Sequence, residues 1–99
     1  MPAVVWSAEA VADLEDIAAY ISRNSPRYAT LTVARLTDAV DRLRRHPESG
    51  RVVPEVDSPT VREVIHGAYR IVYEIRADRV EVLTVFQGAR QFPSLRRAE

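Results

Sequence analysis

Few residue types in this chain are able to carry charge or to move protons. All fourteen basic residues are arginines, and a guanidinium binds phosphate and carboxylate groups as a rigid fork of donors. His46 and His66 are the only side chains that ordinarily titrate near neutral pH, so His66 is a candidate general acid or base. The absence of cysteine excludes disulfides, thiolate metal sites and cysteine nucleophiles. The chain therefore has many residues that could bind anions and few that could transfer protons.

Most of these side chains also have a structural interpretation. His66 directly precedes a glycine at a predicted turn, and His46 ends a predicted helix, where a cation complements the helix dipole. Tyr69 and Tyr73 fall on the apolar face of a predicted strand and are expected in the core. The arginines of residues 42–45 are interpreted either as a solvated face or as a partner surface.

Residues 61–90 contain the pattern around which the chain is organised. Apolar residues, mostly β-branched or aromatic, alternate with polar residues, and turn residues mark the breaks. This pattern is typical of consecutive antiparallel strands. From Tyr69 to Ile75, alternate residues share one apolar face, which we assign to the core.

The register of the last hairpin decides which residues share the second face of the sheet. A two-residue turn at residues 78–79 places Ile75 opposite Val82 and Ile71 opposite Phe86, because a slip by one residue would set Ile75 against a glutamate. The second face then carries three aliphatic residues among charged ones, and we expect the C-terminal tail or a partner to cover them. The three are Val72, Leu83 and Val85.

Two amphipathic helices precede this sheet. Apolar residues recur at spacings of three and four over residues 8–23 and again up to Leu43. Ser7 and Ser25 fit N-cap positions, and Pro26 fits the first helical position, where its missing N–H costs nothing. The short connection predicts an antiparallel helical hairpin. The core between hairpin and sheet is predicted to include Leu36, Val40, Ile71 and Tyr73.

The remaining segments complete the expected fold. A candidate strand at residues 3–6 precedes the hairpin, an irregular crossover at residues 47–60 follows it, and residues 91–99 form a tail without periodicity. Ninety-nine residues suffice for one domain with a modest core. We therefore predict a single α+β domain, residues 1–99, in which an N-terminal helical hairpin packs on one face of a four-stranded antiparallel sheet.

Charge and hydropathy exclude several classes of function. The formal net charge of zero argues against strong non-specific binding to nucleic acid. No apolar run approaches the ~20 residues of a membrane span, and residues 1–6 lack the basic start and long apolar segment of a signal peptide. We expect a cytoplasmic protein without a membrane partner, a metal or a cofactor.

The order of the elements, together with several motifs, resembles the RelE/ParE superfamily of toxins from bacterial toxin–antitoxin modules. The resemblance covers about residues 4–93. It implies a growth-inhibiting toxin that a cognate antitoxin neutralises by wrapping the sheet and helices in a hetero-oligomer. The motifs are Asp13-Leu14 with Ile17 and Tyr20-Ile21, His46-Pro47 with Gly50-Arg51 and Pro54-Glu55, Val61-Arg62-Glu63, Gly67-Ala68-Tyr69-Arg70-Ile71-Val72-Tyr73, residues 80–85, and Gly88-Ala89-Arg90.

The resemblance implies one of two activities. RelE-like members cleave mRNA in the ribosomal A site, whereas ParE-like members inhibit DNA gyrase and have no known catalytic site. By motif position, Arg70 and Arg90 match two arginines of the RelE-like enzymes, and both would neutralise phosphate. However, Val61 and Glu63 occupy the positions of two lysines of those enzymes, and no tyrosine follows Tyr73.

We therefore favour a ParE-like toxin acting on DNA gyrase. The alternatives are a RelE-like endonuclease acting on the ribosome with mRNA, and an inactive domain that only binds its antitoxin; whether the chain is an enzyme stays open. The catalytic candidates are Arg70, Arg90, His66 and Glu55, although Arg70 would also serve structurally by pairing with Glu74 or Glu55. The predicted partner-binding residues are Arg70, Val72, Leu83, Val85, Gln87 and Arg90.

Overall fold

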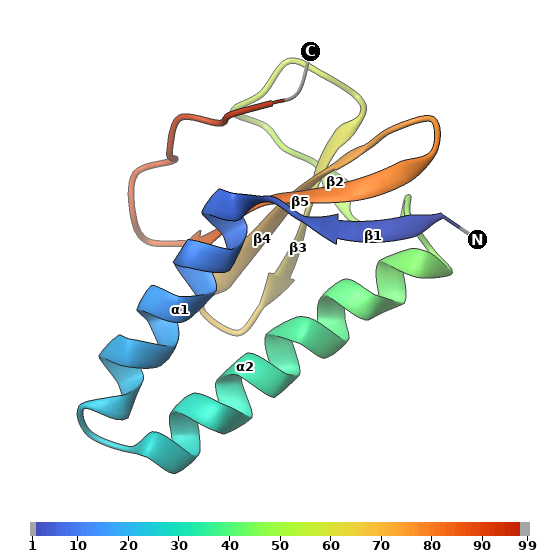
Figure 1. Ribbon diagram of the computed structural model, residues 1–99. Helices are drawn as coiled ribbons and strands as arrows, with labels where there is room; N and C mark the ends of the chain where they lie inside the picture. The colour runs from blue at the N-terminus through green and yellow to red at the C-terminus, as the bar shows by residue number, and fades with distance from the viewer. Residues whose placement is uncertain (1, 98–99) are drawn as a thin grey trace.

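The computed structural model describes residues 2–97, so the last two residues of the expected tail, 98–99, lie outside the described residues. Figure 1 shows the two helices running antiparallel on the same side of the sheet. None of the helices in residues 2–97 is long and apolar enough to span a bilayer. The elements are β1 (Ala3–Trp6), α1 (Ala8–Ser22), α2 (Pro26–Asp41), the 3₁₀ turn η1 (Arg42–Arg44), β2 (Arg51–Val52), β3 (Val61–His66), β4 (Tyr69–Ile75) and β5 (Arg79–Gln87).

The sheet has five strands in the order β1-β5-β4-β3-β2. The α+β class and the helical hairpin are confirmed, but the prediction of four antiparallel strands is wrong in two respects. The two-residue β2 within the crossover adds a fifth strand at one edge. At the other edge β1 runs parallel to β5, because the helices and the rest of the sheet separate these strands and no tight turn forces them antiparallel.

The predicted register of the last hairpin is also wrong. Ile75 lies opposite Val80, and Tyr73 lies opposite Val82. The turn begins earlier than expected, since the Arg76 N–H donates to the Arg79 carbonyl at 2.8 Å.

An irregularity in the β4–β5 ladder then changes which side chains share a face. After the Tyr73–Val82 pair, Val72 lies opposite Thr84, so that Leu83 is an extra residue on β5. Val85 consequently joins the core under the helices, whereas Phe86 joins Leu83 on the opposite face. The assignment of Val85 to the second face is therefore wrong, and that of Leu83 is confirmed.

The main core lies between the hairpin and the sheet. The predicted core residues are confirmed, since their exposed fractions are 1% or less. On α1 the fully buried position is Ala10, and Leu14 and Ile17 pack against the core, whereas Val11 is 42% exposed. The confirmed residues are Leu36, Val40, Ile71 and Tyr73.

A second cluster covers the opposite face of the sheet. It is built on Val53, Val61, Val72, Leu83 and Phe86. Val56 of the crossover and two tail residues, Phe92 and Leu95, pack over it. The chain's own tail, which is one of the two expected covers, lies over this face.

The predicted helix starts are confirmed. The Ser7 and Ser25 hydroxyls each accept a hydrogen bond at 3.0 Å, from the N–H groups of Ala10 and Tyr28 respectively. Pro26 follows as the first residue of α2.

Candidate functional site

Arg70 lies at the centre of a charged cluster on the face of the sheet away from the helices. Its Nε donates to Glu63 at 2.5 Å, and its two Nη atoms donate to both carboxylate oxygens of Glu55 at 2.9 and 2.8 Å. The guanidinium carbon lies 5.3 Å from the ring centroid of Phe86 and 5.1 Å from that of Phe92. Carboxylates therefore occupy the donor fork, and aromatic rings contact the planar group.

The carboxylates of this cluster balance its arginines. The Glu63 side chain is fully buried and also accepts from Arg51 Nε at 2.6 Å. The hydrogen bonds from Arg70 lower the pKa of Glu55, and those from Glu55 and Glu63 raise the pKa of Arg70. Glu55 and Arg70 are therefore both charged at neutral pH. Carboxylates engage three of the five guanidinium N–H groups of Arg70, and the side chain is only 11% exposed, so a phosphate would have to compete with these carboxylates.

Two predicted site residues, Arg70 and Glu55, lie together, but they form an ion pair with each other, which is the structural role considered for Arg70. The pairing of Arg70 with Glu55 is confirmed. The alternative pairing with Glu74 is wrong, because Glu74 accepts from Arg97 at 2.6 and 3.3 Å. A glutamate that accepts two hydrogen bonds from one guanidinium is held as a carboxylate, since the ion pair favours its charged form.

The other predicted residues lie apart from this cluster. His66 ends β3 opposite Tyr69, and within residues 2–97 no hydrogen bond or ion pair joins it to Arg70 or Glu55. Arg90 follows β5 in a turn that its N–H closes on the Gln87 carbonyl at 3.0 Å. Both Gln87 and Arg90 are exposed.

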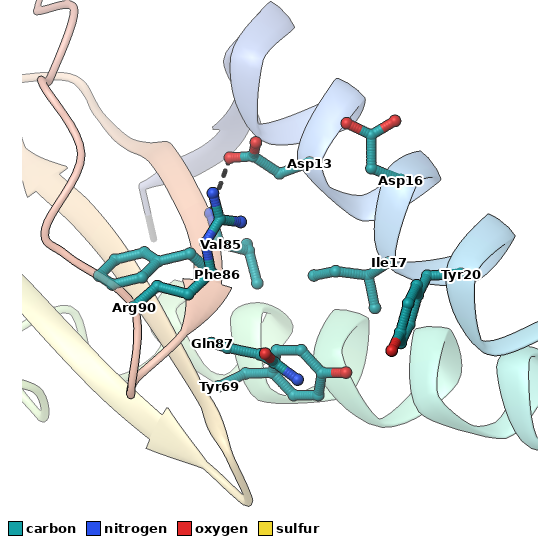
Figure 2. A pocket seen from close by; sticks show the side chains of 9 residues that line it. All are labelled: Asp13, Asp16, Ile17, Tyr20, Tyr69, Val85, Phe86, Gln87 and Arg90. Atoms are coloured by element: carbon teal, nitrogen blue, oxygen red, sulfur yellow. Dashed lines mark hydrogen bonds between the residues drawn. The ribbon is translucent and has the colours of Figure 1, made fainter.

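Arg90 lines a cavity between α1 and the end of β5 (Figure 2), with a volume of about 430 Å³. Asp13 fixes one wall, since its carboxylate accepts from the Thr84 hydroxyl at 2.6 Å and from the Val85 N–H at 3.1 Å. Burial raises the pKa of Tyr69, so this phenol stays protonated near neutral pH. The lining residues are Asp13, Asp16, Ile17, Tyr20, Tyr69, Val85, Phe86, Gln87 and Arg90.

The tail that covers the cluster is held by its side chains. The Phe92 ring meets Phe86 edge to face, with centroids 5.5 Å apart. Arg97 binds Glu74, and Arg96 lies 2.8 Å from Glu9. Among the described residues 91–97, no backbone-to-backbone hydrogen bond occurs, so the tail is a separable cover for this face.

Sequence reasoning missed two residues that organise the site. By motif Glu63 is only an acid at a lysine position, yet its carboxylate joins Arg51 to Arg70. Its alternation with Val61 on β3, on the side of the sheet that carries Arg70, was the available signal. Asp13 was noted only as part of a motif, and no local pattern predicted that its carboxylate would bind the edge of β5.

The chain therefore folds as a helical hairpin on one face of a mixed five-stranded sheet, with its own tail over the opposite face. The family model described as ParE toxin of the type II toxin–antitoxin system parDE matches residues 4–92. The chain therefore belongs to the ParE toxin family, and the superfamily inferred from its motifs is confirmed.

Similar proteins support the same family and fold. The chain is 37% identical over 90 residues to Y4kP of Sinorhizobium fredii, covering 91% of this chain and 92% of Y4kP. It is 36% identical over 91 residues to Toxin RelE2 of Caulobacter vibrioides, covering 91% and 99%. A structure of the chromosomal ParDE toxin–antitoxin system from P. aeruginosa matches with a TM-score of 0.72 at 21% identity, covering 88% of this chain and 96% of that one.

Proposed function

We propose that this type II toxin stops growth by binding DNA gyrase, that it does not cleave RNA, and that a cognate antitoxin neutralises it. The observation that carries the proposal is the state of Arg70. This residue matches the phosphate-binding arginine of the ribonuclease branch by motif, but carboxylates bind its Nε and both Nη atoms, and Phe92 packs against it.

Proton transfer is the second requirement for RNA cleavage, and the predicted candidates among residues 2–97 are poorly placed for it. A general acid or base contributes about 10²–10⁴-fold to such a reaction. His66 lies apart from the arginines, Glu55 is held by Arg70, and an arginine does not release its proton near neutral pH. Membership of the ParE family favours the gyrase branch of the superfamily for the same chain.

Ribosome-dependent mRNA cleavage is the second candidate function. The observation that favours it is the similarity to Toxin RelE2 along nearly the whole of that protein. Under this alternative Arg90, which is exposed beside the cavity, would be the cation that contacts phosphate.

The experiment compares the two targets directly. Purified toxin is added to gyrase with relaxed plasmid and, separately, to translating ribosomes, together with Arg90→Ala and the control Arg35→Ala, which alters an exposed arginine of α2. We expect blocked supercoiling and intact mRNA with the unmodified toxin and with Arg35→Ala. Codon-positioned mRNA cuts that disappear in Arg90→Ala but persist in Arg35→Ala would overturn the proposal, and inactivity in both assays would favour a domain that only binds its antitoxin.

A further inference from the structure

The two sides of the sheet differ in how the backbone beyond the short edge strand is covered. Beyond the end of β1, groups from α1 and its cap occupy the edge of β5: the Ser7 hydroxyl donates to the Leu83 carbonyl, and Asp13 accepts from the Val85 N–H. At the opposite end, β2 pairs only with Arg62 and Glu63, whereas β3 continues to His66. The last part of β3 therefore has a neighbouring strand on one side only.

The backbone of Ile65 points to this open side. The Val53 N–H donates to the Val61 carbonyl at 3.1 Å, so Val61 directs its polar groups toward β2. Because the direction alternates along a strand, Glu63 and Ile65 direct theirs the same way. Arg51 of β2 lies opposite Glu63, but within residues 2–97 no backbone group bonds to Ile65 on this side.

A hollow of about 450 Å³ follows this open edge, at the place where a longer β2 would lie. The chain turns away from β3 at Gly50, immediately before β2. A Cβ atom on Gly50 would lie only 2.5 Å from the Glu63 carbonyl oxygen. Ile65 is 52% exposed, and the open part of β3 carries no proline or lysine, which are common protections of an edge strand. The hollow is lined by Ala39, Arg42, His46, Ser49, Gly50, Arg51, Glu63, Val64 and Ile65.

The charged side chains that line this hollow indicate what kind of segment would bind there. Arg42 and His46 are exposed on its rim, and among the described residues neither takes part in an ion pair. The single acid of the lining, Glu63, is fully buried and already binds Arg51 and Arg70. The lining therefore carries two arginines, Arg42 and Arg51, against the single carboxylate of Glu63.

We propose that the free edge of β3 binds an extended acidic segment of a protein partner, which adds to the sheet as a sixth strand through the N–H and carbonyl of Ile65. The residue opposite Ile65 shares its face and is apolar. The residues on either side of it, opposite Val64 and His66, point to the helix side of the sheet, where Arg42 and His46 bind carboxylates. This is strand addition with backbone affinity and side-chain selection, and it does not depend on which target the toxin inhibits.

The test is a titration of the ¹⁵N-labelled toxin with the capped peptide Thr-Glu-Val-Glu-Thr, followed by amide chemical shifts. We expect saturable shifts at Val64, Ile65 and His66 with millimolar affinity, and none with the charge-reversed peptide Thr-Lys-Val-Lys-Thr. Equal binding of both peptides, no saturable shift at these amides, or shifts confined to β1 would overturn the proposal.

Variants separate the backbone from the side-chain contribution. Ile65→Pro removes the free N–H without breaking the β3–β4 ladder, and should weaken the Glu peptide about tenfold, equivalent to one backbone hydrogen bond. The matched control Ile65→Thr keeps the N–H and should stay within about threefold. Arg42→Glu should weaken binding about tenfold, and it keeps the test valid if Ile65→Pro does not fold. Full binding by Arg42→Glu would contradict the proposed charge selection.

Discussion

Replacing Arg70 with methionine would leave the buried Glu63 carboxylate with a single arginine, Arg51, whose side chain is 62% exposed. Breaking a buried pair by removing one partner typically costs about 3–5 kcal/mol. Methionine keeps apolar contact with Phe86 and Phe92 and fills a similar shape. We therefore expect Arg70→Met to lower the free energy of unfolding by about 3–5 kcal/mol, chiefly by stranding the Glu63 charge.

Urea unfolding followed by circular dichroism measures this change, and a double-mutant cycle isolates its cause. In Arg70→Met/Glu63→Met no buried charge remains in this cluster, so we expect a stability within about 1 kcal/mol of the unmodified chain. The control Arg51→Met removes the exposed partner and should cost no more than about 1 kcal/mol.

The pH dependence of stability is an independent test of this cluster. Arg70 lowers the pKa of Glu55, so this pair contributes stability above the ordinary glutamate pKa of about 4.3 and loses it as the pH falls through the lowered pKa. Arg70→Met lacks that contribution, so the difference in stability between this variant and the unmodified chain should narrow as the pH falls below the ordinary glutamate pKa of about 4.3. A cost below about 1 kcal/mol at pH 7, or a double variant as unstable as the summed single variants, would refute this account of the cluster.

Three further perturbations test the fold and the tail. Leu36→Ala should lower the free energy of unfolding by about 2–5 kcal/mol in a denaturant titration, whereas Leu31→Ala, at a position 43% exposed, should cost far less; equal costs would remove Leu36 from the core. Tyr73→Phe deprives the Gly50 N–H and the Pro47 carbonyl of the hydroxyl that bonds both and should cost about 1–3 kcal/mol by the same titration; no loss would show that water replaces it. Phe92→Ala should speed amide hydrogen exchange in β4 and β5 by releasing the tail, and unchanged exchange would show that the other tail contacts suffice.

The sequence supports prediction of those parts of the fold that depend on local chemistry. Ser7 and Ser25 cap the helices because a hydroxyl at the N-cap accepts an orphan N–H, a rule that needs no tertiary contact. The core face of β4 follows from simple alternation, and Ile71 and Tyr73 are fully buried as expected. The parallel placement of β1 does not follow from any local pattern, because it depends on where the hairpin returns the chain.

The aromatic part of the candidate site was harder to predict because it depends on the β5 irregularity. With Ile71 opposite Phe86, as simple alternation predicted, Phe86 would share the core face under the helices. The extra residue Leu83 turns Phe86 to the other face, where its ring contacts Arg70 and meets Phe92. A change in the pairing of one strand therefore sets the aromatic surroundings of Arg70, which a motif match alone presents as an open phosphate-binding residue.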